Sequence, residues 1–155
     1  MKAALHDAQV ASPQGVGRGS HFITVPRATG ESLEAVLERA MTALHDTGAT
    51  LVSMDILGIP FTSGLAAVEA VTGPITWPVL WIAGPRPSEV GGIQLWAEHS
   101  ARVSPVALKG QVVGSLVDTP DATLCRLGGI NGRIPTRTEA EQTLAALNQM
   151  EDVLH

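Results

Sequence analysis

The segment ESLEAVLERAMTALHDTG, residues 31–48, narrows the possible folds of this chain more than any other. Its apolar residues recur at spacings of three and four, so they form one stripe along a helix, and Gly48 stands where a helix often ends in the left-handed conformation. The stripe consists of Leu33, Val36, Leu37, Ala40, Met41 and Leu44. A helix with one apolar stripe must bury it against another element. Strand-like segments lie on both sides, so the sequence predicts helices packed on a β-sheet.

Strand patterns recur along the rest of the chain. They occupy residues 21–25, 50–59, 75–84, 91–103 and 122–130. In residues 91–103 the alternation puts Ile93, Leu95 and Ala97 on one face and Gln94, Trp96 and Glu98 on the other. Residues 75–84 are apolar on both faces, as in a central strand, but Pro78 lacks an N–H for the ladder and indicates a bulge or an edge. Residues 63–72 are typical of a short helix.

The last fifty residues contain a hairpin and a helix. Residues 104–118 predict two strands that turn at Lys109-Gly110. Thr138 and Glu141 form the capping-box pattern that opens a helix, and apolar residues then recur at helical spacing to the end of the chain. We therefore expect an α+β fold, with a mixed β-sheet and two main helices packed on one face. Residues 1–20 are expected to form a flexible N-terminal tail, and residues 21–155 a single domain.

Composition excludes several classes of function. The formal net charge is −5 and no basic cluster occurs, which argues against nucleic-acid binding. Charged residues make up only 16% of the chain and apolar residues 45%, a balance that favours burial against further copies of the same chain. The one cysteine, Cys125, excludes an internal disulfide. No apolar run approaches the ~18 residues of a membrane span, so we expect no membrane partner and a cytoplasmic location.

The order strand, long helix, strand, short helix, strand, strand resembles the RidA/YjgF-like superfamily, whose fold is shared in outline with trimeric chorismate mutase. The segments GGIQLWAE, GQVVGSLVDTPDATLCRLGGI and EAEQTLAALNQMEDVL are similar to the stretch that joins the two RidA-like halves of chorismatase-type enzymes. The resemblance covers residues 73–154, and residues 21–72 more weakly. It implies a homotrimer with small-molecule sites at clefts between subunits.

The order of the elements leaves two interpretations open. In RidA-like domains a hairpin and a third strand precede the long helix, whereas here that set comes last. The chain is then either permuted, with its C-terminal hairpin completing the sheet begun by residues 21–100, or a truncated relative of a two-domain ancestor. We favour the permuted arrangement because a hairpin without a sheet would expose a flat apolar edge.

The chain also departs from the family at functional positions. RidA-type imine deaminases hold the substrate carboxylate with an arginine near the start of the strand that corresponds to residues 75–84. Thr76 or Trp77 stands there, which argues against imine hydrolysis, and the acidic position of the following strand falls on Gln94. Chorismatases carry most catalytic groups in a C-terminal half that has no counterpart in this sequence, so chorismate hydrolysis is not supported either.

The arginines near Gly128 and Gly129 mark the preferred ligand region. Arg126, Arg133 and Arg137 approach this loop, where glycine amides and guanidinium groups can bind an anion. RidA-like proteins use the corresponding strand end in their pockets. The alternative is a plain turn with solvated arginines, and the sequence does not decide between the two.

The other candidates each have a structural alternative. Glu98 beside His99 can also be a solvated strand end, Cys125 a small buried apolar residue, and the three tryptophans core or interface packing. The candidate catalytic residues are Arg126, Arg133, Gln94 and Glu98, and the candidate substrate-binding residues are Thr76, Trp77, Trp96, Cys125, Gly128 and Gly129. The five histidines show no metal-binding spacing, so we predict neither a metal nor a cofactor.

These features predict an enzyme of isomerase, lyase or hydrolase type. Its substrate would be a small carboxylated or cyclic metabolite of specialised biosynthesis, bound between subunits and converted mainly by orientation and electrostatics. Two alternatives remain: a non-catalytic ligand-binding or partner subunit on the same scaffold, and a structural module whose edge strands dock a larger enzyme.

Overall fold

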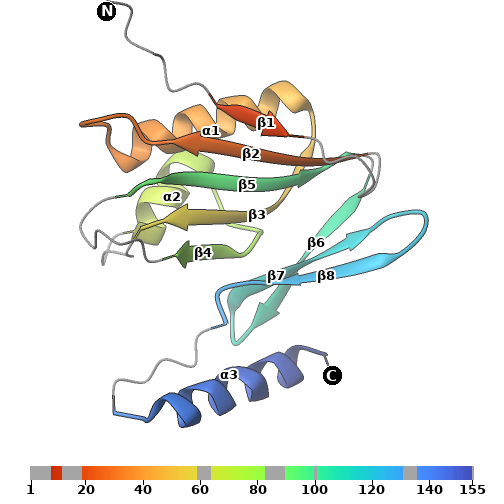
Figure 1. Ribbon diagram of the computed structural model, residues 1–155. Helices are drawn as coiled ribbons and strands as arrows, with labels where there is room; N and C mark the ends of the chain where they lie inside the picture. Colours follow the sequence, from red (N-terminus) through yellow and green to blue (C-terminus); the bar gives the residue numbers. More distant parts are fainter. Residues whose placement is uncertain are drawn as a thin grey trace, which may run out of the picture.

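The computed structural model describes residues 8–11, 19–58, 64–82, 90–99, 101–130 and 136–154, which form an α+β fold with two β-sheets (Figure 1). In chain order the elements are β1 (Gln9–Ala11), β2 (Ser20–Pro26), α1 (Leu33–Thr47), β3 (Thr50–Leu57), α2 (Gly64–Thr72), β4 (Val79–Ile82), β5 (Gly92–Glu98), β6 (Arg102–Leu108), β7 (Gln111–Asp118), β8 (Thr123–Leu127) and α3 (Glu139–Leu154). The predicted class and most predicted elements are confirmed.

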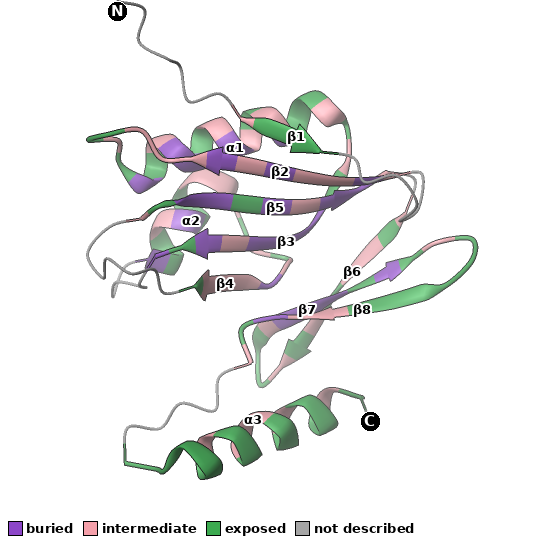
Figure 2. Ribbon diagram, in the orientation of Figure 1, coloured by how far each residue is buried: buried purple, intermediate pink, exposed green. Residues whose placement is uncertain are grey.

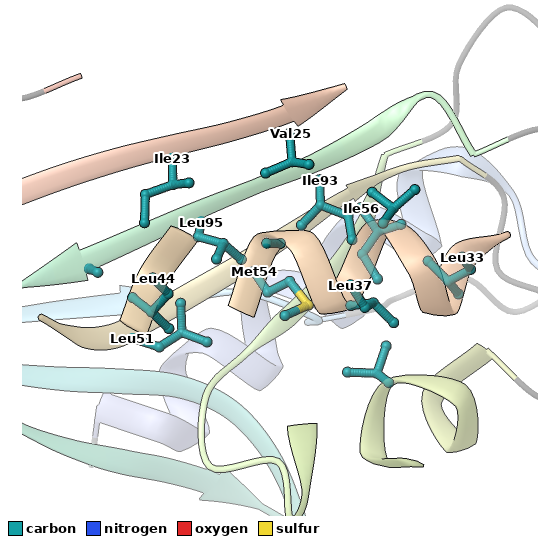
Figure 3. Packing of buried hydrophobic residues seen from close by; sticks show 14 residues of the cluster. Ile23, Val25, Leu33, Leu37, Leu44, Leu51, Met54, Ile56, Ile93 and Leu95 are labelled. Carbon is teal, nitrogen blue, oxygen red and sulfur yellow. The ribbon is translucent and has the colours of Figure 1, made fainter. Parts of the chain in front are cut away.

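The main sheet has the strand order β1-β2-β5-β3-β4. Its three central strands are antiparallel, while β4 runs parallel to β3, so the sheet is mixed. Helices α1 and α2 cover one face, and the apolar stripe of α1 packs there against the alternate apolar residues of β2, β3 and β5. Figure 3 shows Leu37 among the sheet residues Met54, Ile56 and Ile93. The core therefore lies between the two helices and the main sheet.

Helix α1 has the ends that its sequence predicts. Ser32 is the N-cap, and its side chain accepts a hydrogen bond of 3.2 Å from the backbone N–H of Ala35. Gly48 ends the helix at φ 68°, a left-handed conformation that glycine adopts without steric strain. Pro78 acts as predicted, because β4 begins directly after it and lies at the edge of the sheet, where β3 is its one partner among the described strands.

The C-terminal strands form a sheet of their own. Among the described strands, β6, β7 and β8 pair only with one another, so the expectation that this hairpin completes the main sheet is wrong. The turn itself is correct: Lys109 and Gly110 both have positive φ, at 51° and 82°, as a tight hairpin turn requires. The second sheet packs beside β3, where the Ser115 hydroxyl donates a 2.8 Å hydrogen bond to the carbonyl of Val52.

The C-terminal helix does not cover the main sheet. Thr138 and Glu141 form the predicted capping box, with the Thr138 N–H donating to the Glu141 carboxylate at 2.8 Å. Helix α3 then packs against β6, on the far side of the second sheet (Figure 1). None of its residues is buried, and it is mostly exposed in Figure 2. The two helices on one face of the main sheet are therefore α1 and α2.

The N-terminal segment also differs from expectation. Residues Gln9–Ala11, which we placed in a flexible tail, form β1 and pair antiparallel with β2. All three side chains are exposed, so this strand depends on backbone hydrogen bonds rather than on apolar burial. A strand without a buried face leaves no alternation for sequence reasoning to detect.

Candidate functional site

The face of the main sheet opposite α1 and α2 carries polar and aromatic side chains. We call it the polar face; it consists of Ser20, Phe22, Thr24, Asp55, Gln94, Trp96 and Glu98, which alternate along β2, β3 and β5 with residues of the core. The strand register sets Gln94 between Thr24 and Asp55, and the Gln94 amide donates a 3.3 Å hydrogen bond to the Thr24 hydroxyl. Gln94 is exposed, so this row is accessible.

An aromatic pair lies at the middle of the polar face. The rings of Phe22 and Trp96 are stacked, with centroids 6.1 Å apart and planes 10° from parallel. The indole N–H of Trp96 donates a 2.9 Å hydrogen bond to Glu98, and the Ser20 hydroxyl donates to the same carboxylate oxygen. Glu98 is buried, so these two donors compensate for its removal from water. The indole ring is thereby fixed as part of a flat apolar surface.

A charged pair joins the polar face to the second sheet. Asp55 extends from β3 and Arg126 from β8, and the Arg126 Nη2 lies 3.7 Å from the Asp55 Oδ2. This distance allows an ion pair but is too long for a hydrogen bond. Arg126 of β8 lies directly opposite Ser115 of β7 in the second sheet. Paired residues point to the same face, and Ser115 donates its hydrogen bond to β3, so both side chains point toward the main sheet.

The Asp55–Arg126 pair uses only part of its hydrogen-bonding capacity. Two of its buried atoms, the Asp55 Oδ1 and the Arg126 Nε, have no hydrogen-bond partner among the described residues. Burial raises the pKa of the Asp55 carboxyl above its ordinary value, and the positive charge of Arg126 opposes that rise. The Asp55 side chain is 16% exposed and that of Arg126 is 40% exposed, so part of the Arg126 side chain remains within reach of solvent although its Nε is buried. A molecule bound at the polar face can therefore contact the exposed part of the Arg126 side chain.

The raised pKa of Asp55 predicts a pH-dependent difference between the wild type and Asp55→Asn. Well below pH 3.8, the ordinary pKa of the group, Asp55 is protonated in both the folded and the unfolded protein. As the pH rises from there toward the raised folded pKa, the unfolded protein loses this proton while the folded protein keeps it. The stability that protonated Asp55 contributes is lost as the pH rises through its folded pKa. In urea titrations from about pH 3 to 7, we expect Asp55→Asn to gain stability relative to the wild type as the pH increases. A constant difference at all pH values would contradict this.

Four of the residues chosen from the sequence lie at this site. Gln94, Trp96 and Glu98 belong to the polar face, and Arg126 contacts it through Asp55. Their grouping follows from the alternation of β5 and from the packing of β8 beside β3. Whether they bind or convert a ligand remains a prediction.

Three other choices lie elsewhere. Cys125 is exposed and pairs with Leu116, so alternation places it on the opposite face of the second sheet from Arg126. Trp77 packs against the apolar core, and Thr76 is exposed in the segment before β4. The structure does not bring these side chains together with the polar face.

The glycine pair serves packing more than anion binding. A Cβ on Gly128 would lie 2.7 Å from the Leu80 side chain, and the Gly128 N–H already donates to the carbonyl of Val113 at 2.8 Å. Its amide is thus not free for a ligand, and the predicted anion cradle loses this donor. Gly129 is exposed at φ 73°. Arg133 lies outside the described residues.

Sequence reasoning missed Asp55 and the aromatic partner Phe22. Asp55 had a detectable signal, because it is the one charged residue in an otherwise aliphatic strand segment, TLVSMDILGI. A charge at such a position has to find a partner or stay partly solvated. Phe22 needed knowledge of which strand pairs with β5, and that pairing joins segments more than seventy residues apart.

In the part of the chain that the structure describes, no three His, Cys, Asp or Glu side chains gather where they could hold a metal ion. No described helix is both long and apolar enough to cross a bilayer. In comparisons with known proteins, no family model and no curated protein matches this chain.

Proposed function

We propose that the protein is a RidA/chorismatase-like cytoplasmic enzyme that acts on a small carboxylated or cyclic metabolite at the polar face. The observation that carries the proposal is the Arg126–Asp55 pair, in which a 40% exposed arginine side chain lies beside a partly buried carboxyl group. A carboxylate can accept two parallel hydrogen bonds from a guanidinium, which fixes its orientation. The resemblance of the sequence to these enzymes is the basis for proposing an isomerisation, an elimination or a hydrolysis, other than the hydrolysis of imines or of chorismate.

The neighbouring groups suit such a ligand. The stacked Phe22 and Trp96 offer a flat apolar surface to a ring, and Gln94 offers an amide that can donate or accept. Asp55, whose pKa is raised by burial, is placed to give or take a proton beside the bound carboxylate. Catalysis would then rest on orientation and on fixed charge in a partly desolvated site.

The proposed assembly is a homotrimer whose subunits close the site. Gln94 is exposed, and Phe22 and Trp96 are only half-buried, so this part of the polar face is left for another surface to cover. Covering it with a second copy would exclude water from the charged pair and strengthen its interaction with a ligand.

A non-catalytic binding subunit is the second candidate. It is favoured by Glu98, because one oxygen of this carboxylate already accepts hydrogen bonds from both Ser20 and Trp96. A carboxylate held in this way orients the indole ring rather than transferring protons. Asp55 is then the one acid of the polar face that is left for proton transfer. Formation of a product from the bound molecule would identify an enzyme, and its absence a binding subunit.

Fluorescence titration tests the proposed site. Trp96 lies on the polar face, so binding of benzoate or cyclohexene-1-carboxylate should change the tryptophan emission, and Trp96→Phe should remove most of that change. The matching amides, benzamide and cyclohexene-1-carboxamide, have the same rings without the charge and should bind more weakly. Equal responses to acids and amides would refute the site. Product analysis by NMR then separates turnover from binding.

A further inference from the structure

Helix α3 turns its more apolar side away from the protein. The residues that are half-buried against the rest of the chain are Gln142, Ala145, Ala146, Gln149 and Val153. The opposite side carries the exposed residues Leu144, Leu147, Met150 and Leu154, which we call the α3 leucine surface. Leu144 is 58%, Leu147 55% and Leu154 67% exposed. The helix therefore contacts β6 with small and polar residues while its leucines face outward.

This arrangement is more than a scatter of exposed leucines. Single apolar residues on a surface are normal, but residues spaced by three and seven along a helix form one continuous stripe. A hollow of about 250 Å³ lies beside the stripe, lined by Arg137, Glu141, Leu144, Ala145 and Asn148. A stripe next to a hollow provides both apolar area and a place for an anchoring side chain.

The charges of α3 indicate which kind of partner can bind the α3 leucine surface. The helix contains Glu139, Glu141, Glu151 and Asp152 and no lysine or arginine, and Arg137, just before it, is the one cation among the residues that line the hollow. Acids outnumber this arginine, so a second α3 would bring two acidic surfaces together, and an anionic membrane surface would repel the helix as well. A basic segment would instead gain attraction at the rim and apolar burial at the centre.

We propose that the α3 leucine surface docks an amphipathic helix of a partner protein, one whose apolar stripe is flanked by lysine or arginine. The mode is that of two helices packed along their apolar stripes, with anchors spaced by three, four and seven residues. The surface is separate from the polar face, so this inference does not depend on the proposed function.

The test uses a labelled helical peptide of leucine and lysine, with the leucines in one stripe, and follows fluorescence anisotropy. We expect the peptide to bind the wild-type protein, and the double variant Leu144→Gln/Leu147→Gln to bind it at least about tenfold more weakly. Glutamine keeps the length and the helix propensity of leucine, so α3 itself should persist in circular dichroism. Glu151→Gln/Asp152→Asn should also weaken binding and make it less sensitive to salt.

The matched control is Leu65→Gln on α2, because Leu65 is exposed to a similar extent, 52%, but lies outside the α3 leucine surface. It should leave binding unchanged. The proposal is overturned if a peptide with glutamate in place of lysine binds equally well, or if the α3 double variant binds like the wild type. It is also overturned if light scattering shows that the double variant loses a self-association present in the wild type, since the occupant is then a second copy.

Discussion

Replacing Arg126 with alanine is expected to weaken carboxylate binding by about tenfold to a hundredfold while leaving the fold intact. A hydrogen bond to a charged group contributes about 1.5–3 kcal/mol, and a carboxylate held by the guanidinium fork would lose this contribution. The fold should survive because the Arg126 side chain is 40% exposed and forms its described ion pair only with Asp55. Fluorescence titration with benzoate gives the affinity, and circular dichroism verifies the fold.

Two companion variants sharpen this result. Arg126→Lys keeps the charge but loses the planar fork, so it should recover part of the affinity at most. Arg102→Ala removes an exposed arginine from β6 in the same sheet and should leave the affinity unchanged. If Arg102→Ala weakened binding as much as Arg126→Ala, the effect would come from net charge and the assignment of Arg126 would fail.

The largest expected effect on stability comes from Leu37→Ala. Leu37 lies in the middle of α1, is fully buried, and packs in the core cluster between α1 and the main sheet. Alanine is the better helix former, so the loss reflects the apolar contacts and the cavity left behind, about 2–5 kcal/mol. Domains of this kind are stable by only about 5–15 kcal/mol, so this variant should unfold at a much lower urea concentration.

Leu65→Ala is the control for the core. Leu65 is in α2 and 52% exposed, so removing its side chain vacates little packed volume, and the midpoint of urea unfolding should shift only slightly. A similar loss for both variants would mean that α1 is not packed as described.

The elements with a local signal were predictable from the sequence. The stripe of α1, the left-handed Gly48, the Lys109-Gly110 turn and the Thr138 capping box each depend on neighbouring residues, and the structure has all of them. The missing N–H of Pro78 indicated a bulge or an edge, and β4 lies at the edge, although residues 75–84 are apolar on both faces as in a central strand. Such features are encoded within a few residues, so no knowledge of the tertiary fold is needed to find them.

The pairing of the strands was beyond local signals. Strands β6 to β8 alternate as sheet strands do in any sheet, and nothing local states whether they join the main sheet or form another. The preference for one sheet rested on the cost of an exposed edge. In the structure β6 and β8 are edge strands, and the second sheet packs beside the main sheet through Ser115 and through the close contact of Gly128 with Leu80.

The candidate site was only partly predictable, because some of its contacts depend on how the two sheets pack. Alternation along β5 correctly grouped Gln94, Trp96 and Glu98 on one face. The proximity of Arg126 to Asp55 depends on how the two sheets pack, so the sequence could suggest the arginine but not its partner. Alternation also separated Cys125 from Arg126, as the structure has it, and Cys125 should have been left out of the site on that ground.

The most direct test of this account is a double-mutant cycle on Asp55 and Arg126, because the central claim is that the second sheet brings these two side chains together. The free energy of unfolding is measured at neutral pH for the wild type, Asp55→Asn, Arg126→Gln and the double variant. We predict a coupling of about 0.5 kcal/mol or more, with Asp55→Asn more stabilising when Arg126 is absent. Effects that add within about 0.3 kcal/mol would show that the two residues do not interact and would contradict the site.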